Sequence, residues 1–105
     1  MNIRYPFRIT PQEPEGFLVE CLDMENVSTE GYTLEECLFN ASEALTGMLD
    51  FYLDIGESIP KPTQGLKDAY YVAPDAKTQD AVIMRLSRGD RSISETAHGE
   101  KIAVA

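Results

Sequence analysis

The sequence predicts an α+β fold, with a three- or four-stranded, mainly antiparallel sheet and one long helix packed across it. The chain opens with apolar residues at every second position, which is the period of a half-buried strand. Turn-forming residues then separate two further strand-like segments. From Leu34 to Tyr52, apolar residues recur at helical spacing. At 105 residues, the chain has the length of one domain.

Two strands begin the predicted sheet as an antiparallel hairpin. The first has apolar residues at alternate positions, namely Ile3, Tyr5, Phe7 and Ile9. Pro6 has no N–H to donate, so we expect this strand to lie at an edge or to point that amide out of the ladder. The turn segment PQEPEG leads to a second strand in GFLVECL. A third strand is expected near residues 26–30.

The long helix is expected to begin at Thr33. This threonine is a good N-cap, and Glu36 three residues later completes a capping box. The residues on the predicted apolar stripe are Leu34, Cys37, Leu38, Ala41, Leu45, Met48, Leu49 and Tyr52. A stripe of this kind should pack against the sheet.

The second part of the chain is predicted to hold a loop, a short strand and a helix. The segment DIGESIPKPTQG is rich in glycine and proline, and DAYYVA follows as a fourth strand. DAKTQDAVIMRLSRG can form a helix that buries Ala81, Val82, Met84 or Leu86. One weak helical turn is expected at Ser94 to Ala97. We therefore divide the chain into a domain at 1–73 and a helical segment at 74–105.

Acidic residues dominate the first part of the chain. Residues 1–60 carry a formal charge of −10 and the remainder +1, within a total of −9. The helix face opposite the apolar stripe holds Glu36, Glu43, Asp50 and Asp54. The last two lie where the helix dipole disfavours negative charge, and no basic residue four positions away offsets the row. This face is either an ordinary solubilising surface or a surface for a basic partner.

Phe39 lies within the acidic face, about 140° around the helix from the centre of the apolar stripe. It is either a single exposed aromatic residue, which is common, or the anchor of an interface.

Several classes of protein do not fit the composition. Cys21 and Cys37 fall on apolar faces without a CxxC pattern, so buried thiols are expected. His98 is the only histidine, so we expect neither a zinc site nor a catalytic Cys-His pair. No signal peptide and no apolar run long enough to cross a membrane is visible, so we expect a cytoplasmic protein without metal or cofactor.

One enzyme class has to be weighed, because some nucleases hold two metal ions with clustered carboxylates. Glu20, Asp23 and Glu43 are the candidates for such a cluster. Acidic residues on a solvated face are more often structural than catalytic, so we expect no enzymatic activity.

The segments YPFRIT, GFLVECLDMENVSTEGYTLEECLFNASEAL and SIPKPT resemble the N-terminal domain of the HicB antitoxin family. The resemblance covers about residues 4–63. The matching motif residues are Thr29, Gly31, Thr33, Glu36, Cys37 in place of an alanine, Asn40, Ala41, Glu43, Ala44 and Leu45. The resemblance implies a partial ribonuclease-H-like fold without a working carboxylate cluster.

The resemblance also implies a function. Members of this family bind and block a small basic HicA toxin, which cleaves mRNA. The acidic surface would then present the kind of charge that an RNA substrate presents to the toxin. On this interpretation, the toxin-binding residues are Glu36, Phe39, Glu43, Asp50 and Asp54.

Family members usually carry a C-terminal DNA-binding module that represses their own promoter. Here AVIMRLSRGDRSISETA resembles the first helix and the start of the second in a helix-turn-helix, but HGEKIAVA departs from that pattern. Arg85, Arg88 and Arg91 are the candidate DNA contacts, and a solvated helix face is the alternative. Residues 74–105 are interpreted as a truncated helix-turn-helix or as a dimerisation element, and a homo-oligomer is expected. A stand-alone transcription regulator and an orphan HicB-like domain remain the alternative functions.

Overall fold

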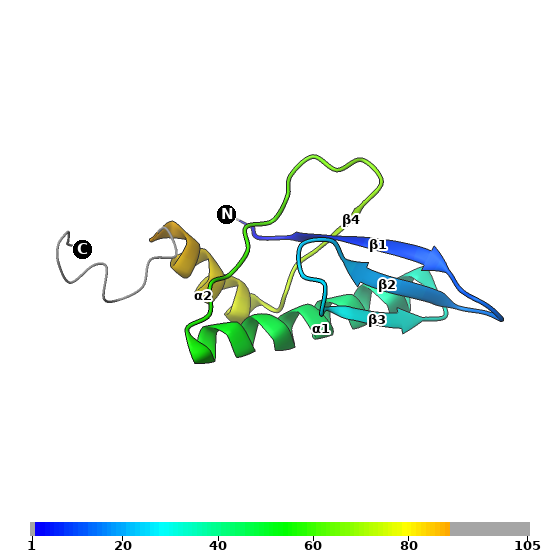
Figure 1. Ribbon diagram of the computed structural model, residues 1–105, viewed down its shortest axis with the longest axis horizontal. Coiled ribbons are helices and arrows are strands. Elements are labelled where there is room, and N and C mark those ends of the chain that lie inside the picture. The colour runs from blue at the N-terminus through cyan, green and yellow to red at the C-terminus, as the bar shows by residue number, and fades with distance from the viewer. Residues whose placement is uncertain (1, 89–105) are drawn as a thin grey trace.

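The computed structural model describes residues 2–88 and contains a four-stranded antiparallel sheet with two helices (Figure 1). The elements are β1 (Tyr5–Pro11), β2 (Phe17–Cys21), β3 (Ser28–Gly31), α1 (Leu34–Ile55), β4 (Tyr70–Val72) and α2 (Ala76–Ser87). The strands lie in the order β3-β2-β1-β4, and α1 runs along one face of the sheet. The predicted α+β class and the order of elements are confirmed. The helical turn expected at Ser94 to Ala97 lies outside the described residues.

β1 is an interior strand, so of the two alternatives for Pro6 the edge position is wrong. β1 pairs with β2 on one side and with β4 on the other. The carbonyl of Pro6 accepts a hydrogen bond of 2.9 Å from the amide of Leu22, one residue beyond the end of β2. The N–H and C=O of a strand residue point to the same side, so the missing donor falls where the β1–β2 ladder ends. An interior strand can therefore hold this proline.

The start of α1 follows the predicted cap. The hydroxyl of Thr33 accepts from the amide of Glu36 at 3.0 Å, and the Glu36 carboxylate accepts from the amide of Tyr32 at 2.6 Å. Gly56 ends the helix with a φ of 73°, in the left-handed region that favours glycine.

The apolar stripe of α1 packs on the sheet through a row of fully buried residues, which are Cys37, Ala41, Leu45 and Leu49. Leu38, Met48 and Tyr52 are partly buried at its borders. Leu34 was expected on the same stripe, but it is 46% exposed. Its place in the first helical turn leaves it at the end of the packed row, and the stripe prediction is wrong there.

β3 approaches α1 closely at one glycine. A Cβ built on Gly31 would lie 3.0 Å from both the backbone nitrogen and the Sγ of Cys37. Three residues further along α1, the side chain of Asn40 donates a hydrogen bond of 2.8 Å to the carbonyl of Glu30. The absence of a side chain at Gly31 thus lets this edge strand sit directly on the helix.

The segment between α1 and β4 arches over the side of the sheet away from α1 (Figure 1). Thr63 fixes it to the β2–β3 turn, because its amide and hydroxyl donate to the Asp23 carboxylate at 2.8 and 2.7 Å. The hydroxyl of Tyr71 donates to the carbonyl of Thr63 and accepts from the amide of Leu66. The segment is therefore held by side chains from two strand regions.

α2 packs beside the second half of α1. Its N-cap, Asp75, accepts from the amide of Thr78 at 2.8 Å, and the Asp75 amide donates to the Thr46 hydroxyl on α1. Val82 is buried as predicted, whereas Met84 is exposed. Within residues 2–88, neither helix is long and apolar enough to cross a membrane.

Candidate functional site

The acidic face of α1 is exposed along its length. Glu36, Glu43, Asp50 and Asp54 all lie on the side of the helix away from the sheet. Phe39, between the first two of these carboxylates, is 63% exposed. The sequence-predicted residues therefore share one solvent-facing surface, and Phe39 is not part of the core.

Two of these four carboxylates already have partners within the chain. Glu36 accepts from the amide of Tyr32 as part of the helix cap. Asp50 accepts a hydrogen bond of 2.7 Å from the hydroxyl of Thr78 on α2. These contacts give both residues a structural reason to be acidic. Glu43 and Asp54 have no hydrogen bond or ion pair with another residue in the range 2–88.

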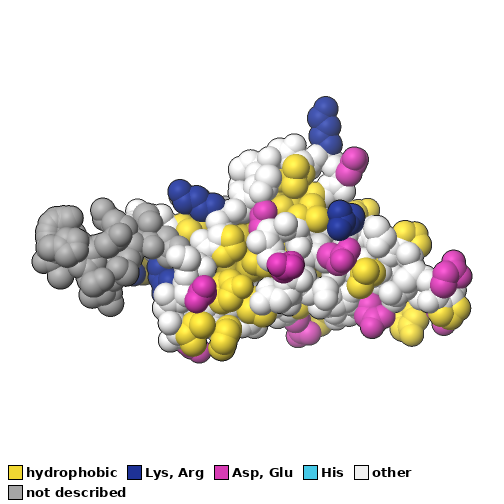
Figure 2. Space-filling view, in the orientation of Figure 1, with side chains coloured by type: hydrophobic (Ala, Val, Ile, Leu, Met, Phe, Trp, Pro, Cys, Tyr) yellow, Lys and Arg dark blue, Asp and Glu magenta, His cyan; other side chains and the backbone are white. Residues whose placement is uncertain are grey.

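Two apolar residues on the exposed part of α1 were not among the site residues predicted from the sequence. Phe51 is 54% exposed and Ile55 is 55% exposed. Apolar side chains gather at the C-terminal end of α1 in the space-filling view (Figure 2). The helical count that singled out Phe39 also places Phe51 about 100° from the centre of the buried row, so the signal was present in the sequence.

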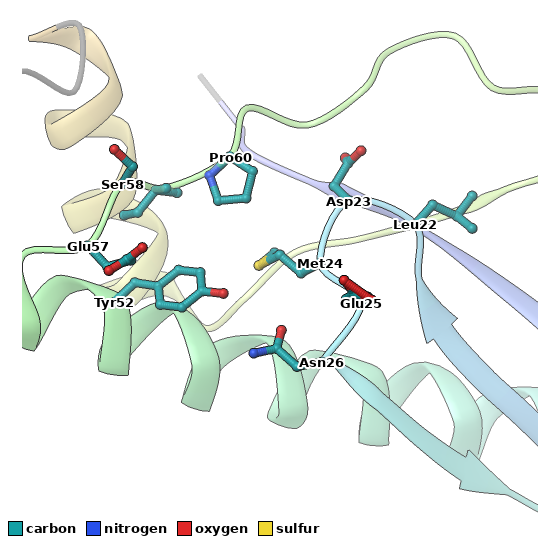
Figure 3. Close-up of a pocket in the computed structure, with 10 residues that line it drawn as sticks. Leu22, Asp23, Met24, Glu25, Asn26, Tyr52, Glu57, Ser58 and Pro60 are labelled. Carbon is teal, nitrogen blue, oxygen red and sulfur yellow. The ribbon is translucent and has the colours of Figure 1, made fainter.

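An open groove lies on another side of α1. It is formed by the β2–β3 turn at residues 22–26, by Tyr52 and by the segment at 57–60 (Figure 3). Met24 and Asn26 extend from the turn toward Tyr52, and Pro60 lies on the opposite side of the opening. No pattern in the sequence indicated this groove, because its three parts are distant in the chain.

The carboxylates considered for a metal-dependent nuclease do not come together. Glu20 on β2 pairs across the strands with Arg8, with 3.5 Å between the charged groups. Asp23 holds the amide and hydroxyl of Thr63, and Glu43 lies on the far side of α1 from the sheet. In the described part of the chain, no three His, Cys, Asp or Glu side chains are grouped as metal ligands.

The candidate DNA contacts are placed in different ways. The guanidinium of Arg85 donates to the carbonyl of Glu57 at 3.2 Å, so it contacts the end of α1. Arg88 is exposed at the C-cap of α2. Arg91 lies outside the described residues.

Both cysteines are buried as free thiols, in agreement with the sequence prediction. Burial is the main cause that raises the pKa of the Cys21 thiol and the pKa of the Cys37 thiol. Both groups are therefore un-ionised at neutral pH, which suits small core residues better than nucleophiles.

Comparison with known families agrees with the fold and the motif residues. A family model described as the HicB_like antitoxin of bacterial toxin-antitoxin systems matches residues 4–78. The chain belongs to the HicB-like antitoxin family. The match covers the whole sheet, α1 and the first residues of α2. It includes residues 4–63, over which the sequence resembles this family.

Two curated relatives of this HicB-like chain illustrate how far the similarity extends. Antitoxin HicB of Escherichia coli K12 is 36% identical over 61 residues, which is 58% of this chain and 44% of the relative. Antitoxin HicB 1 of Photorhabdus laumondii subsp. laumondii is 39% identical over 61 residues, again 58% of this chain and 39% of the relative. The similarity thus spans less than half the length of either relative.

Proposed function

We propose that this chain is the antitoxin of a type II toxin-antitoxin pair and that it sequesters a small basic ribonuclease of the HicA kind without catalysing a reaction itself. The observation that carries the proposal is the family match over residues 4–78. The acidic first part of the chain supports it, since a charge of −10 over residues 1–60 suits a partner that binds RNA.

We place the toxin on the exposed face of α1, at Glu36, Phe39, Glu43, Asp50 and Asp54. The unpaired carboxylates Glu43 and Asp54 supply the attraction, because they have no hydrogen bond or ion pair with another described residue. Exposed Phe39 supplies an apolar anchor. Charge complementarity of this kind mainly raises the association rate, while affinity comes from a few buried anchors.

Charge reversal tests this surface. Glu43→Lys with Asp54→Lys should lower the association rate for the toxin by about tenfold at low salt, and the difference should shrink at high salt as screening shortens to about 3 Å at 1 M. The matched control is Glu15→Lys with Asp68→Lys, which makes the same charge change at exposed positions outside α1 and α2. Equal effects of the two pairs would show that only net charge matters and that the face is wrongly placed.

We also propose that the chain self-associates and contributes to repression of its own promoter through residues 74–105. The family resemblance and the exposed Arg88 at the end of α2 support this part of the proposal. A gel shift with promoter DNA, at physiological salt, tests it with the chain alone and with the toxin added. A shift by the chain alone would favour a stand-alone regulator. No shift in either case would remove autoregulation.

A further inference from the structure

The groove between the β2–β3 turn and the end of α1 has an apolar floor. Met24 and Ile59 line it and are nearly fully buried. The ring of Tyr52 is half-buried and extends along one wall, facing the turn (Figure 3). Pro60 and the exposed Leu22 add apolar surface at the rim. The groove can therefore cover the aliphatic stem of a long side chain.

The polar groups of this groove are mostly acceptors. Three carboxylates line it, from Asp23, Glu25 and Glu57, and no lysine or arginine is among its lining residues. Asp23 is occupied by Thr63. The carboxylates of Glu25 and Glu57 have no hydrogen bond or ion pair with any residue in the described range. Glu57 lies on the Tyr52 side of the groove and Glu25 lies on the side of the turn (Figure 3), so a cationic donor between them would have an unpaired acceptor on either side.

The neighbouring basic side chain, Arg85, does not pair with these carboxylates. Arg85 lies near the groove and donates to the main-chain carbonyl of Glu57, rather than to its carboxylate. The opposite face of α1, with Glu43 and Asp54, cannot serve the groove either, because Tyr52 belongs to the sheet-facing side of the helix. The groove is thus a surface distinct from the acidic face of α1.

We propose that this groove receives an arginine side chain of the basic protein partner, and this inference rests on the antitoxin function proposed above. A planar guanidinium can stack on the Tyr52 ring with donors toward Glu57, while the Glu25 carboxylate adds attraction from the turn side of the groove. A lysine ammonium is a compact point charge and uses the ring and the two carboxylates less fully. The partner is therefore held at two separate places, by attraction along α1 and by insertion of one side chain in the groove.

Toxin binding by groove variants is the first test. Glu25→Gln with Glu57→Gln removes both charges, and because neither carboxylate has a partner among the described residues, folding should be preserved, as circular dichroism can verify. The dissociation rate of the complex should rise by about tenfold, as expected for a charge pair at an interface. The matched control, Glu15→Gln with Asp80→Asn, should change it less than about twofold. Unchanged toxin binding by the groove variant would overturn the arginine site and leave the antitoxin function standing.

A direct probe separates the two proposals. N-acetyl-arginine-amide is titrated into the full chain and followed by NMR, with N-acetyl-citrulline-amide as a neutral compound of the same shape. Arginine should shift the amide signals of residues 22–26, Tyr52 and 57–60, and the shifts should disappear in the Glu25→Gln, Glu57→Gln variant. Absent shifts, or equal shifts with citrulline, would contradict the site. Localised arginine binding by a chain that fails to bind the toxin would support the groove and refute the proposed function.

Discussion

Replacing two glycines by alanine should change stability in opposite directions. In Gly31→Ala, the new Cβ would meet the backbone nitrogen and the Sγ of Cys37, each at 3.0 Å, and the Cα of Cys37 at 3.2 Å. Backbone atoms cannot rotate away, so β3 has to move from α1. Overpacking of this kind costs about 1–3 kcal/mol. Gly47 lies on the exposed face of α1 with nothing within 4 Å of its Cβ position, so Gly47→Ala should stabilise the protein by about 0.5–1 kcal/mol through helix propensity.

Urea unfolding followed by circular dichroism measures both effects, and equal denaturant slopes show that the unfolded states are comparable. The expected result is a lower midpoint for Gly31→Ala and a higher midpoint for Gly47→Ala. A neutral or stabilising Gly31→Ala would refute the close approach of β3 to α1, because the same substitution would then fit without movement of the backbone.

Three further predictions concern side chains with defined roles. Asp23→Ala should lose about 1–3 kcal/mol of stability in urea unfolding, because two accepted hydrogen bonds disappear. Glu25→Ala should be nearly neutral. Equal losses in the two variants would contradict the role of Asp23 in holding Thr63. The hydrogen bond from the Thr78 amide holds the pKa of Asp75 below its ordinary value of 3.8, so its contribution to stability is complete above that pH and is lost as the pH falls through the folded value. Asp75→Asn should weaken the loss of stability at acid pH, as measured by unfolding at several pH values. An unchanged pH dependence would contradict the contribution of Asp75. Cys21 and Cys37 should react with a thiol reagent only after unfolding, and rapid labelling of the native protein would show that they are accessible.

Local patterns in the sequence account for much of the fold. Alternating residues predicted the β1–β2 hairpin, and the spacing of Thr33 and Glu36 predicted the start of α1, because both signals depend on residues close together in the chain. The edge position allowed for Pro6 was wrong, because the local rule does not say where a ladder ends. Its missing N–H falls just beyond the end of β2, which depends on the length of another strand.

The candidate site was less predictable, because its contacts join distant segments. The Asp50 carboxylate was recognised as unusual for the end of a helix, but its partner Thr78 lies 28 residues away on α2. The Asp23 carboxylate was considered as a metal ligand, and its partner Thr63 lies 40 residues away. Hydrophobic periodicity carries no information about such pairs, nor about a groove assembled from three separate segments.

Growth rescue tests the central claim most directly. We expect a small basic reading frame beside this gene. That reading frame is expressed from one inducible promoter, and this chain is expressed from another. The antitoxin function predicts that growth stops with the neighbour alone, resumes when this chain is present, and that the two proteins co-purify. A toxic neighbour that this chain neither neutralises nor binds would contradict the account, and it would leave a HicB-like fold without that partnership.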